Sequence, residues 1–212
     1  MPLGYVGRSM RLYLAGPDVF LANALDVGAR KRALCAERGH EGLSPIDSEP
    51  RPRGASAIFR ANCALMRRAD AGVFNLTPFR GPSADAGTAF ELGFLFGLGK
   101  PVFGYTSRGG AYAKRVREQT GKLARRRGQL WDASGVAVEQ FGLADNLMIA
   151  CAIAEAGGPL VAVSERGPEA LAAFRAFEKL LDRLAVRLGP HAFTGTHTSR
   201  PPLPVRGSKA SP

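Results

Sequence analysis

Short apolar runs alternate along this sequence with segments of helical periodicity, and this alternation limits the folds open to the chain. Strand-length runs lie at 11–16, 40–45, 71–76, 101–105 and 160–163. Segments with apolar residues at helical spacing separate or follow them, at 20–38, 57–69, 86–98, 145–156 and 171–188. Such alternation is typical of a parallel sheet covered by helices on both faces. The pattern therefore predicts an α/β fold with a doubly wound, five-stranded parallel sheet.

The ends of the chain differ in character from its middle. Residues 1–10 lack periodicity and are predicted to form a disordered leader, and residues 191–212 hold four prolines and are predicted to be a disordered tail. A single domain is expected over 11–190. No apolar run approaches the roughly 18 residues that a membrane span needs. The scattered cysteines fit free thiols in a reducing compartment, so we expect a cytoplasmic protein with no membrane contact.

The formal net charge of +11 raises the question of a nucleic-acid partner. Much of the excess lies in Lys114–Arg127, which holds seven basic residues and one acid. This basic segment, at about 111–130, is predicted to be partly helical. It lacks the interleaved aromatic residues that single-strand binders use for stacking. A solvated surface is therefore expected there, and nucleic-acid binding is not.

Two carboxylates, Asp85 and Glu91, lie where a Pro- and Gly-rich loop enters the apolar helix expected at 86–98. Burying Glu91 two turns into that helix is costly unless the carboxylate is paired or used. A carboxylate is a suitable nucleophile at an anomeric carbon, because it stabilises an oxocarbenium-like transition state and then traps it. Glu91 is thus either catalytic or a surface residue. Asp85 suits a helix N-cap, a sugar-hydroxyl acceptor or both.

Other residues fit a pocket around these acids. Ligands of open parallel sheets bind beyond the carboxyl ends of the strands, so the loops after Gly16, Asn75 and Tyr105 are expected to converge. The phenol of Tyr13 either hydrogen-bonds Glu91 or packs in the core. The hydroxyl of Thr88 could orient either acid. Arg80 is either a substrate clamp or a solvated loop residue, and Asn146 could cap its helix.

Taken together, YLAGPDVF, NLTPFRGPSADAGTAFELG, GKPVFGY and FGLADNLM resemble the nucleoside 2-deoxyribosyltransferase family. The resemblance runs from about residue 12 to about residue 156. It implies a flavodoxin-like fold and transfer of a 2-deoxyribosyl group between nucleobases, in nucleoside salvage. It also implies 2′-deoxynucleosides and free nucleobases as substrates, no cofactor or metal, and a dimer or hexamer with shared active sites.

The resemblance assigns roles residue by residue. Glu91 is the implied nucleophile, which forms a covalent 2-deoxyribosyl-enzyme, and Tyr13 orients it. Asp85 is implied to bind the sugar hydroxyls. Asn62 is implied to contact the nucleobase and assist its protonation, because the family has Asp or Asn at this position. Further substrate contacts are implied for Gly16, Pro17, Phe20, Phe79, Arg80, Thr88, Asn146 and Met148, with Asn146 reaching a neighbouring subunit's site.

Two other functions remain open on the same scaffold. One is an N-glycosidase that releases the base from a 2′-deoxynucleoside or its nucleotide to water. Asp85 would repel a 5′-phosphate, whereas Arg80 and the basic segment would attract one. The other is a nucleotide-sensing domain without catalysis.

Overall fold

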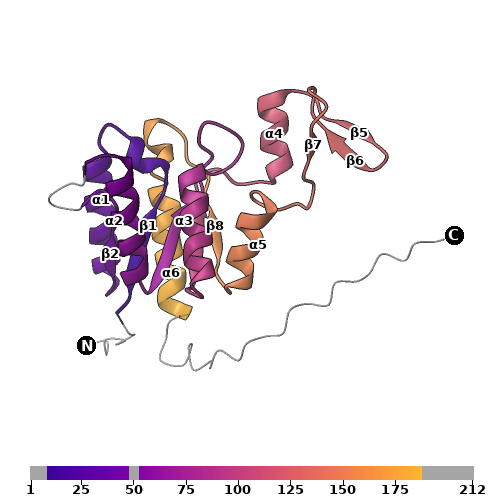
Figure 1. Ribbon diagram of the computed structural model, residues 1–212. Coiled ribbons are helices and arrows are strands. Elements are labelled where there is room, and N and C mark those ends of the chain that lie inside the picture. Colours follow the sequence, from indigo (N-terminus) through magenta and orange to yellow (C-terminus); the bar gives the residue numbers. More distant parts are fainter. Residues whose placement is uncertain (1–8, 48–52, 188–212) are drawn as a thin grey trace.

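The computed structural model describes residues 9–47 and 53–187. Five strands form one parallel sheet, in the order β2-β1-β3-β4-β8 (Figure 1). They are β1 (Arg11–Ala15), β2 (Glu41–Leu43), β3 (Ala71–Asn75), β4 (Val102–Thr106) and β8 (Leu160–Ala162). The chain proceeds from β1 to one side through β2 and to the other through β3, which is the flavodoxin-like order. The predicted five-stranded, doubly wound sheet is confirmed.

Helices cover both faces of this sheet. Helices α1 (Ala24–Ala36) and α6 (Phe174–Arg187) cover one face, and α2 (Ala55–Arg68), α3 (Ala86–Gly97) and α5 (Leu147–Glu155) cover the other. In Figure 1, α3 and α5 lie in front of the sheet and α6 lies behind it. Successive side chains of a strand point to opposite faces. Leu12 and Leu14 accordingly pack beneath α1 and α6, whereas Tyr13 faces the α2 and α3 layer.

Two of the predicted helices begin later than expected. The helix predicted from Phe20 begins at Ala24, and residues Pro17–Phe20 form a separate 3-10 turn, η1. Proline at the first position favours such a turn, because its fixed φ suits a helical start and it has no N–H to leave unpaired. Likewise, Pro168–Leu171 form the 3-10 turn η2 before α6. The consequence for the site is that Phe20 belongs to a short loop and not to α1.

The sequence pattern places Ile58, Leu65 and Met66 on one apolar face of α2 and Asn62 off that face, and this prediction is partly wrong. Ile58 is 46% exposed, whereas Cys63 and Met66 are buried against the sheet. Asn62, predicted to lie off the packed face, is half-buried and points toward α3. The tertiary position of α3 therefore decides which stripe of α2 is covered.

The basic segment folds into more structure than the sequence predicts. Helix α4 (Tyr112–Thr120) is followed by a three-stranded antiparallel sheet of β5 (Ala124–Arg126), β6 (Gln129–Trp131) and β7 (Ala137–Val138). This unit projects from the main sheet at the upper right of Figure 1. Its strands have two or three residues each, which is too short for a period of two to be recognised, and β7 lies within 132–141, where the sequence pattern predicts irregular structure. Strand β5 is exposed throughout, as expected for a charged edge.

The predicted leader, apart from residues 9 and 10, and the predicted tail lie outside the described residues. Residues 48–52 of the loop expected at 46–54 and Leu188 of the last apolar stripe lie outside them as well. Over the part of the chain that the structure describes, no helix has both the length and the apolarity needed to cross a bilayer.

A buried ion pair that the sequence does not predict fixes the loop after β1. Lys31, only 2% exposed, donates from Nζ to Asp18 Oδ2 and to the Tyr105 hydroxyl, both at 2.8 Å. Burial lowers the pKa of Lys31, and the neighbouring Asp18 carboxylate opposes that shift. Asn75 Nδ2 donates to Asp18 Oδ1 and to the Leu171 carbonyl, both at 2.8 Å. The network therefore joins η1, α1, β3, β4 and the end of η2.

Replacing Lys31 tests this network. Lys31→Met leaves Asp18 buried without its cation, so the free energy of unfolding is expected to fall by about 3 kcal/mol in urea titrations. The double variant Asp18→Asn/Lys31→Met removes both charges and is expected to recover most of the loss. The exposed Lys179 provides the matched control as Lys179→Met, expected to be neutral within about 0.5 kcal/mol. Equal effects of the two single lysine variants would contradict the assigned pair.

Candidate active site

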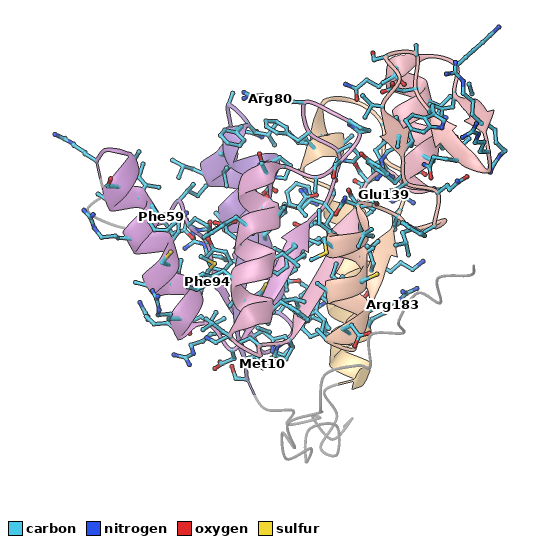
Figure 2. All side chains as sticks on the ribbon, turned by 45° about the vertical axis from the view of Figure 1, so that its right-hand side comes forward. Met10, Phe59, Arg80, Phe94, Glu139 and Arg183 are labelled. Carbon is cyan, nitrogen blue, oxygen red and sulfur yellow. The ribbon has the colours of Figure 1, made fainter. Side chains whose placement is uncertain are left out.

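The predicted convergence of loops occurs at the carboxyl edge of the sheet, between β1 and β3. Gly16, which follows β1, lies so close to β3 that an added Cβ would sit 2.4 Å from the Cβ of Asn75. A side chain at this position would therefore separate the two strand ends. Arg80, from the loop after β3, lies at this end of the molecule, and Met10, which precedes β1, lies at the opposite end (Figure 2). The loop after β4 reaches this edge as well, since the Ser107 N–H donates to Thr77 Oγ1 in the loop after β3 at 3.1 Å, whereas the Tyr105 side chain is buried beneath α6.

Glu91 on α3 is the centre of the candidate site. Its carboxylate oxygen Oε1 accepts a hydrogen bond from the Tyr13 hydroxyl at 2.5 Å and a longer one from Asn62 Nδ2 at 3.5 Å. The alternation along β1 places Tyr13 on the face beneath α3, where its ring is fully buried. Of the two alternatives left open for Tyr13, both hold: its ring lies in the core, and its phenol reaches Glu91.

The surroundings of Glu91 shift its ionisation toward neutral pH. Burial raises the pKa of Glu91 to about 7, while the Tyr13 and Asn62 hydrogen bonds lower it and the Asp85 charge raises it. Burial and the neighbouring carboxylate raise the pKa of Tyr13 well above its ordinary range. The phenol therefore keeps its proton and remains a donor to Glu91. The result is a carboxylate that is ionised in a substantial fraction near pH 7 and is held at one oxygen.

Asp85 is the N-cap of α3. Its Oδ2 accepts from the Thr88 backbone N–H at 2.9 Å and from the Thr88 hydroxyl at 3.2 Å. The Thr88 hydroxyl is thereby used on Asp85, and it does not serve Glu91. Among the described residues Asp85 Oδ1 has no hydrogen-bond partner, so this oxygen is available to a ligand. The capping role and a ligand role are compatible, because they use different oxygens.

Phe20, Phe79 and Arg80 form an aromatic rim at the same edge. The rings of Phe20 and Phe79 stack with their centroids 5.1 Å apart and an angle of 8° between them. The Arg80 guanidinium lies 4.8 Å from the Phe79 centroid and 5.6 Å from that of Phe20. Phe20 is 58% exposed. An exposed ring that is held parallel to a second ring offers a flat surface suited to stacking a heteroaromatic ligand. Gly16 and the buried Pro17 precede this rim.

Asn146 is the N-cap of α5, and its carboxamide is held on both sides. Its Oδ1 accepts from the Met148 N–H at 3.0 Å, and its Nδ2 donates to Glu139 Oε1 at 2.7 Å. The second Glu139 oxygen accepts from the Leu147 N–H at 2.9 Å. The Met148 side chain is 72% exposed. The structure thus places both residues at the end of α5, with Met148 pointing outward.

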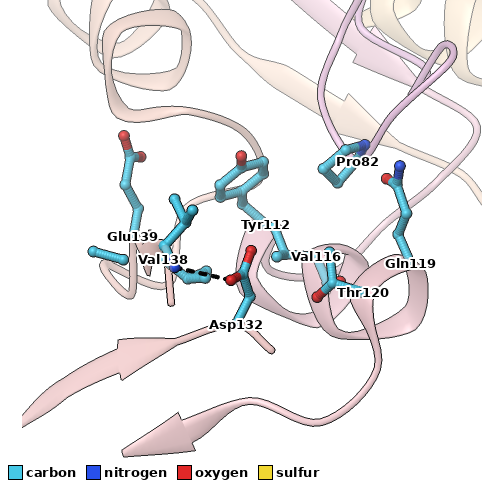
Figure 3. A pocket seen from close by; sticks show the side chains of 10 residues that line it. Pro82, Tyr112, Val116, Gln119, Thr120, Asp132, Val138 and Glu139 are labelled. Carbon is cyan, nitrogen blue, oxygen red and sulfur yellow. Dashed lines mark hydrogen bonds between the residues drawn. The ribbon is translucent and has the colours of Figure 1, made fainter. Parts of the chain in front are cut away.

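Glu139 also borders a cavity of about 280 Å³ between α4, β7 and the loop after β3. Figure 3 shows Pro82, Tyr112, Asp132 and Glu139 around it. Val116 and Val138 form its apolar part. Sequence reasoning missed this cavity, because it depends on the packing of the small antiparallel sheet.

Metal-binding residues do not gather in the described part of the chain, where no group of three or more His, Cys, Asp or Glu side chains is suitably placed. The three cysteines are free thiols: Cys35 and Cys63 are buried, and Cys151 is exposed.

Comparison with known proteins identifies the group to which this chain is related. The model of the nucleoside 2-deoxyribosyltransferase family matches residues 12–148. An uncharacterized protein of Schizosaccharomyces pombe is 33% identical over an alignment of 195 positions, and the match covers 84% of this chain and 89% of that protein. The structure of a 2-desoxiribosyltransferase from Leishmania mexicana is 29% identical, with a TM-score of 0.57, over 81% of this chain and 97% of that one. The chain therefore belongs to the nucleoside 2-deoxyribosyltransferase family.

Proposed function

We propose that this protein transfers a 2-deoxyribosyl group between nucleobases through a covalent intermediate on Glu91. A Glu91 carboxylate oxygen attacks C1′ of a 2′-deoxynucleoside, and the N-glycosidic bond breaks. The base leaves with the bonding electron pair and takes up a proton. A nitrogen of a second base then attacks C1′, the bond to Glu91 breaks with its electron pair returning to the carboxylate, and the second base loses a proton to solvent. Two displacements at one carbon give net retention of configuration.

The single observation that carries this proposal is the hydrogen bond from Tyr13 to Glu91 at the edge of the sheet. A nucleophilic carboxylate has to be ionised and oriented, and one donor on Oε1 supports both requirements while Oε2 stays available for attack. The family resemblance implies the same pairing, in which Tyr13 orients Glu91 as the nucleophile.

The substrate contacts follow from the positions of the remaining residues. The free oxygen of Asp85 is assigned to the sugar hydroxyls. The rim of Phe20 and Phe79 is assigned to the base, with Gly16 and Pro17 beside it. Arg80 is assigned to the outer part of the base pocket.

Asn62 is an amide at a position where an aspartate could protonate the leaving base. An amide has no proton to give, so Asn62 is assigned to holding Glu91 and contacting the base. The proton for the leaving base is then assigned to solvent.

We also propose that the active form is a homo-oligomer. Phe59 on α2 and Phe90 and Phe94 on α3 form a cluster of tilted rings, with centroids 5.9 and 6.1 Å apart. Phe59 is 54% exposed and Phe90 is 51% exposed. An exposed aromatic group of this size is typical of a protein interface. A partner subunit over α2 and α3 would lie beside Glu91.

Base exchange separates the proposed transferase from a hydrolase. Incubating a 2′-deoxynucleoside with a second free base is expected to yield the new nucleoside, with a rate that depends on that base. Chromatography of the products measures this directly. Base release that is indifferent to the acceptor, without any new nucleoside, would instead identify an N-glycosidase.

The covalent step has its own readout in the same experiment. A 2-fluoro-2-deoxyarabinosyl nucleoside is expected to leave a sugar adduct on the peptide that contains Glu91, because fluorine destabilises the oxocarbenium-like state that deglycosylation requires. Glu91→Gln should show no adduct and no turnover, while Glu118→Gln, on the exposed face of α4, should match the wild type. Binding without any turnover by the wild type would support a sensing domain.

The pH dependence of activity follows from the pKa of Glu91. Because the ionised carboxylate is the nucleophile, kcat/KM is expected to rise with pH up to a limb near 7. Tyr13→Phe removes a hydrogen bond that stabilises the charged form, so the limb should move to higher pH and kcat/KM at pH 7 should fall by about 10- to 100-fold. A limb that stays in place would contradict the assignment of Tyr13.

The oligomer is tested at the aromatic cluster. Phe90→Glu places a charge within the proposed interface, and sedimentation velocity is expected to show a smaller species than the wild type. Phe141→Glu is the matched control, since Phe141 is 67% exposed and lies beyond β7, away from α2 and α3. A wild-type monomer, or equal behaviour of both variants, would contradict an interface over α3.

A further inference from the structure

Arg115, within the basic segment, is directed into the protein and not toward solvent. Only 6% of the residue is exposed, and its guanidinium donates four hydrogen bonds. Nε donates to the Pro82 carbonyl at 2.7 Å, and one terminal nitrogen donates to the Gly110 carbonyl at 3.2 Å. The other terminal nitrogen donates to the Ala144 carbonyl and, at 3.4 Å, to Asp145 Oδ2. Arg115 therefore joins the loop after β3, the loop before α4 and the loop before α5.

Asp145 completes the connection from the opposite side. It is 2% exposed, and each of its oxygens accepts two hydrogen bonds. Oδ1 accepts from the Ser83 hydroxyl and from the Asn146 N–H, the latter at 2.7 Å. Oδ2 accepts from the Ala84 N–H at 3.1 Å and from Arg115. One carboxylate thus holds the residue immediately before Asp85 and the backbone of Asn146.

We propose that Arg115 and Asp145 are positioning residues that fix Asp85 for the sugar of this chain's own site and Asn146 for the sugar of a neighbouring subunit's site. This inference rests on the proposed function, because Asp85 is its assigned sugar contact and the family resemblance implies Asn146 as a contact in a neighbouring subunit's site. Both are helix N-caps. Asp85 follows Ala84, whose N–H donates to Asp145, and Asn146 follows Asp145 itself and donates its own N–H to that carboxylate. Helices α3 and α5 also pack against one another beneath the two caps. The pair therefore controls the distance between two polar side chains at two helix ends.

The chemistry of the pair suits positioning more than binding of an anion from solution. All of the Arg115 contacts are internal, three backbone carbonyls and one carboxylate, and the planar guanidinium matches their directions. A lysine has a single nitrogen and no comparable spread of donors. Without a cation, Asp145 would be an unpaired buried charge. Arg115, from a different element, α4, supplies that cation. The projecting unit of α4 and β5–β7 thereby becomes part of the machinery of the site.

Analogues that lack one sugar hydroxyl measure the position of the caps. Wild-type enzyme is expected to prefer a 2′-deoxynucleoside over the 2′,3′-dideoxy and 2′,5′-dideoxy analogues. In Arg115→Met, kcat/KM for the 2′-deoxynucleoside is expected to fall by about 10- to 100-fold, whereas kcat/KM for at least one analogue should fall much less. The preference for the 2′-deoxynucleoside over that analogue is therefore expected to be lost. A variant that is only less stable would lose activity on all three substrates alike. Arg115→Lys should resemble Arg115→Met, and exogenous guanidinium should restore part of the preference.

Two further variants keep the test decisive. Arg117→Met removes an exposed arginine from the same helix and is expected to retain the wild-type preference. Ser83→Ala removes one hydrogen bond to Asp145 and is expected to weaken the preference partially, which provides an answer if Arg115→Met fails to fold. An unchanged preference in folded Arg115→Met, or in Ser83→Ala if that variant alone folds, overturns the inference.

Hydrogen exchange gives a readout that does not depend on turnover. The amides of Ala84 and Asn146 both donate to Asp145, so in Arg115→Met or Ser83→Ala they are expected to exchange about tenfold faster, while amides within α3 keep their rates. Wild-type enzyme without activity on any deoxynucleoside would refute the proposed function, and these amides would still decide whether the pair holds the two caps. Unchanged exchange at both amides overturns the inference whether or not the enzyme is active.

Discussion

The hydrogen bond between Tyr13 and Glu91 joins two residues that are 78 positions apart and depends on almost every feature of the fold. The phenol reaches α3 only because Tyr13 occupies the face of β1 opposite Leu12 and Leu14. The carboxylate meets it only because α3 lies across β1 and β3, where an apolar helix surface is buried. Burying a carboxylate there is costly, and burial accordingly raises the pKa of Glu91. The site is thus a polar exception within the layer of α2, α3 and α5.

Two buried ion pairs hold the loops around this exception. Lys31 on α1 pairs with Asp18 in the turn that carries Phe20, and Arg115 and Asp145 lie beneath the loop that leads to Asp85. Charged hydrogen bonds to backbone and to carboxylates are directional, and so they define positions that hydrophobic contacts would leave loose. The buried charges of this protein are concentrated where the loops need to be fixed.

The basic segment contains two kinds of arginine and lysine. Arg115 is enclosed, and its charge is matched by Asp145, whereas Lys114 and Arg117 on the same helix are exposed. The exposed charges fit the solvated surface expected from the sequence. The enclosed one shows that net charge alone is a poor guide to the use of a basic stretch, because the three residues lie within four positions of the chain and differ in the direction in which α4 presents them.

The sequence by itself determined the order and type of the main elements, since period-two and period-3.6 patterns are local and the sheet follows from their alternation. It also identified Asp85 and Glu91, because a carboxylate in an apolar helix is visible without coordinates. Only the tertiary structure decided that Asn62 lies beside Glu91, that Phe20 stacks on Phe79, and that Lys31 and Arg115 are interior. Each of these contacts joins elements distant in sequence, and a charged side chain gives no local sign of the partner that allows its burial. The short strands β5–β7 were missed for the same reason, as two or three residues form a strand only when a neighbour supplies the other half of the hydrogen bonds.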